Sequence, residues 1–131
     1  MELDHVGIAV RALEPAMATY QDGLGLAPGV PEVVTSQKVR VSFIEVRDTH
    51  IELLEPTDAS SPIARFLDSR GEGLHHLAFR VPSVDRALDG LAQQGRKLID
   101  RVGRPGARGR RVGFAHPSAF HGTLVEFVEL P

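Results

Sequence analysis

Apolar residues alternate with small or polar ones near the start of the chain. Within residues 4–10, positions 6, 8 and 10 are valine or isoleucine, and a period of two is typical of a strand that buries one face. Over 13–24 the apolar residues recur every three or four positions before Gly25, which predicts an amphipathic helix. Two apolar-rich segments, 39–46 and 51–55, predict strands that complete a first strand–helix–strand unit.

The same order of elements recurs about 71 residues further along the chain. Residues 75–81 repeat the alternation of 4–10, and a histidine occupies the second place of each segment: His5 in the first and His76 in the second. The matching elements expected downstream are a helix over 84–95 and strands at 111–115 and 123–129. An internal repeat of this kind indicates two similar supersecondary units. We therefore interpret the chain as two βαβββ modules, which is an α+β fold.

A short segment connects the two modules. Ser61 followed by Pro62 is typical of a helix start, so we expect a linker helix there. The expected boundaries are about 1–56 for the first module, 61–70 for the linker helix and 74–131 for the second module. Neither module is large enough to form a stable fold easily on its own, so we expect a single domain over 1–131 with a shared core. The Gly- and Arg-rich run at 103–111 is interpreted as a loop.

The composition limits the chemistry that the chain can perform. Of its 131 residues, 42% are hydrophobic and 24% are charged, as in a soluble globular protein. The formal net charge of −2 gives no global reason to expect nucleic-acid or membrane binding. The chain has no cysteine, so disulfides, thiolate nucleophiles and cysteine-ligated zinc are excluded. A metal site would have to use histidine, carboxylate or amide ligands.

The N-terminus also bears on location. Met1–His5 is acidic and lacks the basic start and long apolar run of a signal peptide. No stretch approaches the roughly 18 apolar residues of a membrane span. We therefore expect a cytoplasmic protein.

Strand parity places one histidine and one glutamate of each module on the sheet face away from its helix. These pairs are His5 with Glu52 and His76 with Glu126. A buried glutamate without a partner is costly, whereas two imidazoles and two carboxylates are ligands that suit Zn, Mn, Co, Ni or Fe(II). Each residue alone would more often be an ordinary strand residue, so the predicted metal site rests on their joint recurrence. His75 competes with His76, but register and parity favour His76.

Several segments carry a resemblance to a known family. They are Asp4–Val10, Ile51–Pro56, Ser61–Leu67, Gly73–Phe79, Leu98–Asp100, Gly106–Gly109 and Phe114–Pro117. Together they resemble the methylmalonyl-CoA epimerases of the vicinal oxygen chelate superfamily, which also contains glyoxalase I and the extradiol dioxygenases. The resemblance runs nearly from end to end. The paired modules alone indicate only the superfamily, whereas the linker, the Gly-Leu-His-His strand and the His-Pro loop are more specific to the epimerases.

The resemblance implies an eight-stranded open barrel around a divalent metal ion, commonly within a homodimer. It implies His5, His76 and Glu126 as ligands, with Glu52 at a fourth position that holds Gln or Glu in the family. It also implies an isomerase of propionate metabolism that interconverts (2R)- and (2S)-methylmalonyl-CoA. The C2 proton lies between a thioester and a carboxylate, so its loss gives an enolate. A metal ion on the thioester oxygen would stabilise that charge as a Lewis acid.

Epimerisation needs proton removal from one face of C2 and delivery to the other, for which two positioned acid–base groups are an economical solution. Glu126 is the first candidate. Some family members place the second on the strand before the first-module ligand. Glu45 is the only carboxylate within 38–46 of this chain. Glu52 or a metal-bound water are the alternatives.

Two further residues are candidates for substrate binding. The resemblance places His116 and Pro117 in a loop near the substrate, and the alternative is a turn whose proline ends the preceding strand. Arg108 belongs to a basic cluster with three other arginines of 103–111. These cations could meet the phosphates of an acyl-CoA through charge-assisted hydrogen bonds. A solvated loop is an equally good reading of that cluster.

Two other functions stay open at the level of the sequence. A glyoxalase I-like lyase acting on a glutathione hemithioacetal would use the same His/Glu arrangement and the same enolate chemistry. A non-catalytic small-molecule-binding member of the superfamily would keep the fold and lose the ligands, and the presence of all four ligand-type residues argues against it. A dioxygenase is less favoured, because its ligand set is two histidines and one carboxylate.

Overall fold

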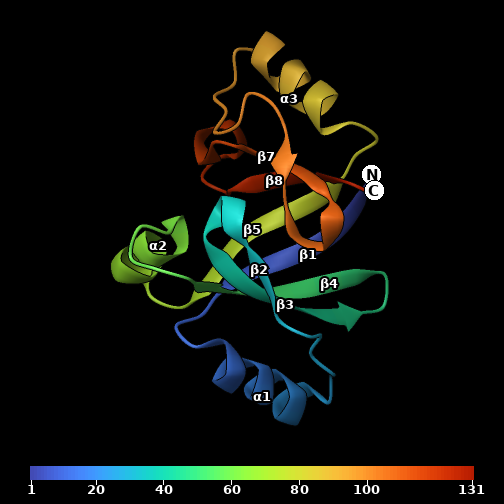
Figure 1. Cartoon of the computed structure of the whole chain (residues 1–131). Helices are drawn as coiled ribbons and strands as arrows, with labels where there is room; N and C mark the ends of the chain where they lie inside the picture. The colour runs from blue at the N-terminus through green and yellow to red at the C-terminus, as the bar shows by residue number, and fades with distance from the viewer. The chain divides into compact units, whose positions relative to one another are not determined.

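The computed structural model describes residues 1–131 and contains three α-helices and eight strands (Figure 1). The helices are α1 (Leu13–Leu24), α2 (Pro62–Arg70) and α3 (Val84–Gln93). The strands are β1 (Glu2–Ala9), β2 (Glu32–Val34), β3 (Val39–Val46), β4 (Thr49–Pro56), β5 (Gly73–Arg80), β6 (Arg104–Pro105), β7 (Arg111–Ala115) and β8 (Val125–Glu129). Three short 3-10 turns are η1 (Thr35–Gln37), η2 (Ala107–Gly109) and η3 (Pro117–Phe120). No helix is long and apolar enough to span a membrane.

The chain divides into two compact units. His5–His75 forms the N-terminal unit, and His76–Pro131 together with Met1–Asp4 forms the C-terminal unit. Each unit has the order strand, helix and three strands that the internal repeat predicts. The α+β class with eight strands is therefore confirmed.

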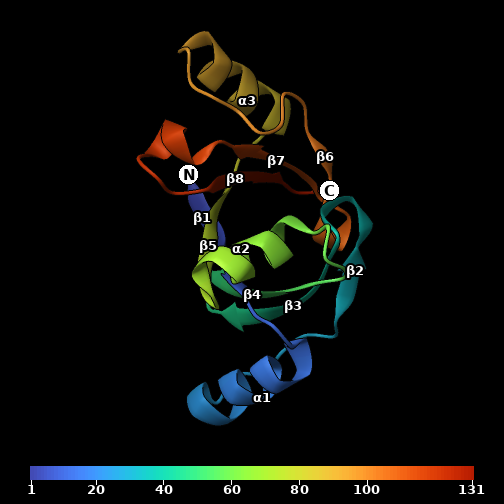
Figure 2. The same ribbon diagram turned by 90° about the vertical axis from the view of Figure 1, so that its left-hand side faces the viewer.

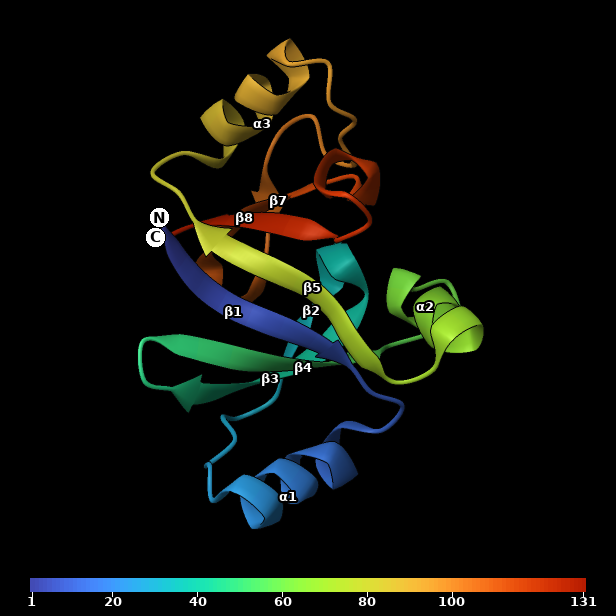
Figure 3. The same cartoon turned by 180° about the vertical axis from the view of Figure 1, so that it is seen from behind.

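In the N-terminal unit the strands neighbour one another in the order β2-β3-β4-β1. β3 and β4 form an antiparallel hairpin, and β4 runs parallel to β1, as Figure 3 shows. Helix α1 packs through Leu13 against Val10, Ile44 and Leu53, which are all buried. Its first N–H groups have no side-chain cap at Ala12, but the Glu55 carboxylate accepts the Leu13 N–H at 2.7 Å.

In the C-terminal unit the order is β5-β8-β7-β6, with β5 parallel to β8 and the other pairs antiparallel. Helix α3 lies against β7 and β8 (Figure 2). Its Val84 and Leu88 are fully buried against Val125 and Phe127. Gly113 permits this approach, because a Cβ there would lie 2.8 Å from Leu88 and 2.9 Å from Val84.

The linker helix lies where the sequence predicts it. The Ser61 hydroxyl accepts the Ile63 N–H at 3.2 Å, and Pro62 occupies the first turn. The run at 103–111 differs from the prediction of a plain loop. It contains the two-residue strand β6 and the turn η2, because residues 104–105 pair with β7.

Candidate functional site

The N-terminal unit holds one buried histidine–glutamate pair. The parallel register sets Gly7 of β1 opposite Glu52 of β4, so His5 lies on the same face as Glu52, two positions earlier. The His5 Nε2 atom is 3.2 Å from the Glu52 Oε1 atom, and the two side chains are only 4% and 5% exposed. Phe43 of β3 is in register with Glu52, and its ring meets the His5 ring edge-on at 5.5 Å between centroids.

The C-terminal unit repeats this arrangement. Ala78 of β5 lies opposite Glu126 of β8, so His76 is again two positions before the residue that faces the glutamate. The His76 Nε2 atom is 3.1 Å from Glu126 Oε1, and the side chains are 2% and 4% exposed. Phe114 of β7 is in register with Glu126, and its ring meets the His76 ring edge-on at 5.7 Å. Histidine, glutamate and phenylalanine therefore recur in one geometry in both units.

Each pair places an imidazole nitrogen and a carboxylate oxygen side by side where water is largely excluded. A buried carboxylate needs a compensating charge or hydrogen bonds. Imidazole nitrogen and carboxylate oxygen are also ligand types that a first-row divalent metal takes. The donor chemistry and the burial of each pair thus fit one half of a metal site.

The phenylalanines were not anticipated among the site residues. Phe43 and Phe114 are separated by 71 residues, the same interval that separates His5 from His76. Searching the repeat for aromatic residues at that interval would have found them.

The two adjacent histidines of β5 lie on opposite faces of the strand. His75 points away from the His76 face and packs edge-on against Phe66 of α2, with 4.9 Å between ring centroids. His76, and not His75, therefore lies on the strand face that carries Glu126, as alternation along the strand predicts. His50 lies inside β4, and its ring is 6.1 Å from the Phe43 ring.

Glu45 lies near the end of β3, directly opposite His50 of β4. Because it is two residues from Phe43, it shares the sheet face that carries Glu52. Its side chain is exposed, unlike that of Glu52. The register thus settles which face Glu45 occupies, which the sequence could not do.

His116 is the N-cap of the turn η3. Its Nδ1 atom accepts the backbone N–H of Ser118 at 3.0 Å and lies 2.9 Å from the Ser118 hydroxyl oxygen. Because Nδ1 acts as an acceptor, a neutral His116 ring carries its proton on Nε2. The residue can therefore offer a hydrogen-bond donor from that nitrogen.

Arg108 takes part in a charged cluster around Asp4, which is fully buried. The Asp4 carboxylate lies 2.5 Å from Arg110 Nη1, 2.8 Å from Arg80 Nε and 3.4 Å from Arg108 Nη2. The hydrogen bond to Asp4 raises the pKa of Arg80. Arg108 has a left-handed backbone with φ of 58°, which is uncommon for a residue with a side chain. We name these four residues the Asp4 cluster.

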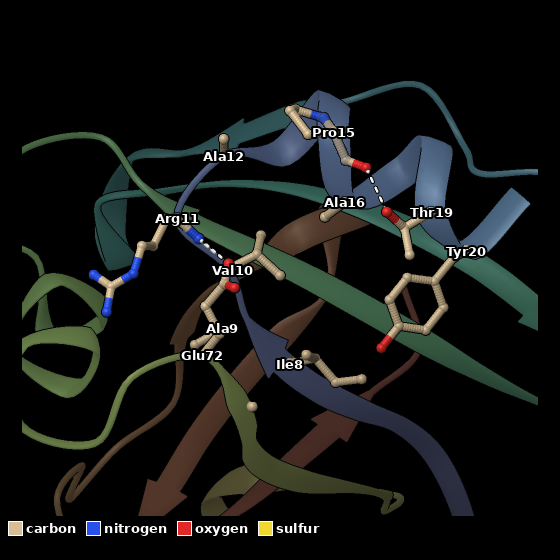
Figure 4. Close-up of a pocket in the computed structure, with 11 residues that line it drawn as sticks. Ile8, Ala9, Val10, Arg11, Ala12, Pro15, Ala16, Thr19, Tyr20 and Glu72 are labelled. Carbon is tan, nitrogen blue, oxygen red and sulfur yellow. Dashed lines mark hydrogen bonds between the residues drawn. The ribbon is translucent and has the colours of Figure 1, made fainter. Parts of the chain in front are cut away.

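A separate hollow of about 520 Å³ lies in the N-terminal unit beside α1 and the end of β1 (Figure 4). Its lining residues are Ile8, Ala9, Val10, Arg11, Ala12, Pro15, Ala16, Thr19, Tyr20, Glu72 and Gly73. The Arg11 N–H donates to the Glu72 carboxylate at 2.8 Å on its rim. None of the predicted site residues lines this hollow.

Comparison with known proteins decides the family. Residues 4–114 match the model of the Glyoxalase/Bleomycin resistance protein/Dioxygenase superfamily. The chain belongs to this superfamily. The predicted resemblance is confirmed by relatives that match nearly the whole chain.

Three of these relatives are similar over almost their full length. The uncharacterized protein YqjC of Bacillus subtilis is 42% identical over 97% of this chain and 91% of its own. The ethylmalonyl-CoA/methylmalonyl-CoA epimerase of Cereibacter sphaeroides is 40% identical over 98% and 97%. A variant of the Streptomyces coelicolor methylmalonyl-CoA epimerase, solved with 2-nitronate-propionyl-CoA, is 32% identical, with a TM-score of 0.95 over 98% of this chain and 94% of that one.

Proposed function

We propose that the chain is a metal-dependent epimerase that interconverts (2R)- and (2S)-methylmalonyl-CoA through an enolate. The observation that carries this proposal is the buried His–Glu pair that recurs in the same register in both units. A repeated pair of metal-ligand types is what an enolate-forming metalloenzyme of this superfamily requires. Similarity to epimerases at 40% and 32% identity supports the same activity.

The proposed metal ligands are His5, Glu52, His76 and Glu126. All four are buried and of a kind that could hold a metal ion. Two imidazoles and two carboxylates suit a first-row divalent ion such as Co, Mn, Zn, Ni or Fe. When bound, such an ion supplies Lewis-acid stabilisation of the charge that develops on the thioester oxygen. Because each unit contributes one pair, we propose that residues 1–131 act as a single domain.

The chain's own carboxylates would move the proton. In this proposal Glu126 exchanges a proton with C2 on one face and Glu45 exchanges it on the other. Removal by one carboxylate and delivery by the other inverts the carbon with no net change in protons. Glu45 shares the sheet face of Glu52 and is exposed, so it can exchange its proton with water.

Two polar residues would bind the substrate. His116 can donate a hydrogen bond from Nε2, because Ser118 holds its other ring nitrogen as an acceptor. Arg108 would meet an anionic group of the acyl-CoA, since its side chain is 28% exposed within the Asp4 cluster. We also predict a homodimer. A measurement of the molar mass of the protein in solution tests this prediction.

The decisive assay follows the C2 proton of methylmalonyl-CoA by NMR in deuterated water. The metal-loaded protein is expected to exchange that proton and to equilibrate both epimers, and chelator treatment is expected to stop both processes. A glutathione hemithioacetal is assayed in parallel. Turnover of the hemithioacetal without exchange at C2 would replace the epimerase by a glyoxalase I-like lyase. Tight ligand binding without either reaction would indicate a binding protein.

A further inference from the structure

The arginines between residues 103 and 111 do not share one environment. Arg108 and Arg110 belong to the Asp4 cluster. Arg111 donates from Nη2 to both carboxylate oxygens of Asp85, at 2.9 Å and 3.0 Å. Only Arg104 is held against an aromatic ring, because its guanidinium carbon lies 5.5 Å from the centroid of Phe114. Arg104 therefore differs from its neighbours in what it touches.

Strand register places Arg104 on the face that carries the His76–Glu126 pair. Arg104 of β6 lies opposite Val112 of β7, and Phe114, two residues on, lies opposite Glu126 of β8. Residues two apart on a strand share a face, so the Arg104 side chain is on the Glu126 side of this unit. The Phe114 ring that it covers also meets the His76 ring. One aromatic ring thus separates the guanidinium from a proposed metal ligand.

Arg111 occupies the opposite face. It alternates with Val112 along β7, together with Gly113, which packs against Leu88 of α3. The Arg104 and Arg111 side chains, which are close in the sequence, therefore lie on opposite faces of the same sheet. This contrast provides a matched control for Arg104.

Asp100 forms an ion pair with Arg104. One carboxylate oxygen of Asp100 accepts the Phe114 N–H at 2.9 Å, and the other lies 3.2 Å from Arg104 Nε. The guanidinium thus lies between a carboxylate that is itself anchored to β7 and the face of an aromatic ring. Its side chain remains 33% exposed, so a ligand can reach it. A pre-oriented guanidinium loses less side-chain entropy when it binds an anion.

We propose that Arg104 binds the free carboxylate of a 2-carboxyacyl-CoA substrate and so distinguishes such thioesters from simple acyl-CoAs. This inference rests on the proposed function and names the residue that selects its substrate class. A guanidinium has five N–H donors in a planar fork, which matches a carboxylate. A substrate carboxylate brought near Glu126 is repelled by that side chain, and Arg104 offsets the repulsion. The same cation lowers the cost of the second negative charge that C2 deprotonation creates.

The test compares two ligands that differ only in this carboxylate. Calorimetry measures the affinity of the metal-loaded full chain for methylmalonyl-CoA and for propionyl-CoA. Replacement Arg104→Leu is expected to weaken methylmalonyl-CoA binding by roughly 10- to 100-fold. Propionyl-CoA binding is expected to change by less than about twofold, because it lacks the group that Arg104 contacts. Arg104→Lys keeps the charge without the fork and is expected to retain part of the preference.

Arg111→Leu is the matched control and is expected to leave the ratio of the two affinities unchanged. If Arg104→Leu weakens both ligands and free CoA equally, Arg104 contacts the CoA phosphates and the proposal is overturned. An unchanged ratio in both Arg104→Leu and Arg104→Lys also overturns it. Should the leucine variant fail to fold by circular dichroism, the lysine variant alone decides. These outcomes differ from failure of the proposed function, in which the unaltered protein shows no C2 exchange.

Discussion

Phe43 and Phe114 each pack edge-on against a histidine of their own unit, at 5.5 Å from His5 and 5.7 Å from His76. They are 71 residues apart, as the histidines are. The repeat therefore extends beyond the ligand-type residues to the rings that orient them. Replacing a group that fixes the orientation of a metal-binding imidazole typically lowers metal affinity by roughly 10- to 100-fold.

Loss of either ring is expected to weaken metal binding. Phe43→Leu and Phe114→Leu should each lower Co(II) affinity by about tenfold, because the imidazole is no longer held. Each should also lower the free energy of unfolding by roughly 1–3 kcal/mol. The control is Phe66→Leu, which removes a ring that packs against His75 instead. That variant should lose stability and keep its Co(II) affinity; equal losses of affinity in all three variants would contradict a specific role for the paired rings.

The Asp4 cluster is expected to contribute strongly to stability. Asp4→Asn leaves three guanidinium groups around a neutral side chain, and should lower the free energy of unfolding in urea by about 2–4 kcal/mol. Glu2→Gln removes the exposed partner of Arg80, whose ion pair measures 2.8 Å, and should cost less than about 1 kcal/mol. If the two substitutions lower the free energy of unfolding equally, the burial of Asp4 adds nothing to the stability that this cluster provides.

The stability of the protein is expected to depend on Asp85 in acid. The Gly103 N–H, followed by Arg111, lowers the pKa of Asp85 below its ordinary value of 3.8. The carboxylate is therefore favoured in the folded state, and its stabilisation is present above the unfolded pKa and lost as the pH falls through the lower folded value. In acid titrations of unfolding, the difference between the unaltered protein and Asp85→Asn should shrink as the pH falls below about 4. A difference that is constant across that range would contradict this assignment.

Glu45 is expected to carry one of the two proton transfers. Glu45→Gln should slow epimerisation by about 100-fold or more, since a positioned acid–base group contributes about that factor. One epimer should still exchange its C2 proton with deuterated water through Glu126, and the metal content should be unchanged. Asp89→Asn, an exposed carboxylate of α3 paired with Arg101, is the control and should behave as the unaltered protein. Full epimerisation by Glu45→Gln would remove Glu45 from the mechanism.

The features that could be predicted from the sequence are those that depend on a pattern within a single segment. The alternation around His5 and His76 set the parity of both strands, and the Ser61–Pro62 start located α2. Strands β2 and β6 are only three and two residues long, too short to show an alternation, and their place depends on pairing with β3 and β7.

Long-range contacts could not be predicted in the same way. The partners of Asp4 are 76 to 106 residues away in the sequence, so no local sequence pattern predicts them. Glu45 could be assigned to a face only from its register with His50. The sheet face that Arg104 occupies could likewise be assigned only from the pairing of β6 with β7, because composition alone grouped it with the other arginines.

The central claim is that the two His–Glu pairs serve one metal ion, and equilibrium dialysis against Co(II) tests it most directly. The unaltered chain is expected to bind one ion, and His5→Ala and His76→Ala should each lose affinity by at least about 100-fold, although the two residues belong to different units. His75→Ala, adjacent in sequence but on the other face, should bind one ion normally. Two ions per chain, or a half-site variant that keeps its affinity, would contradict the account.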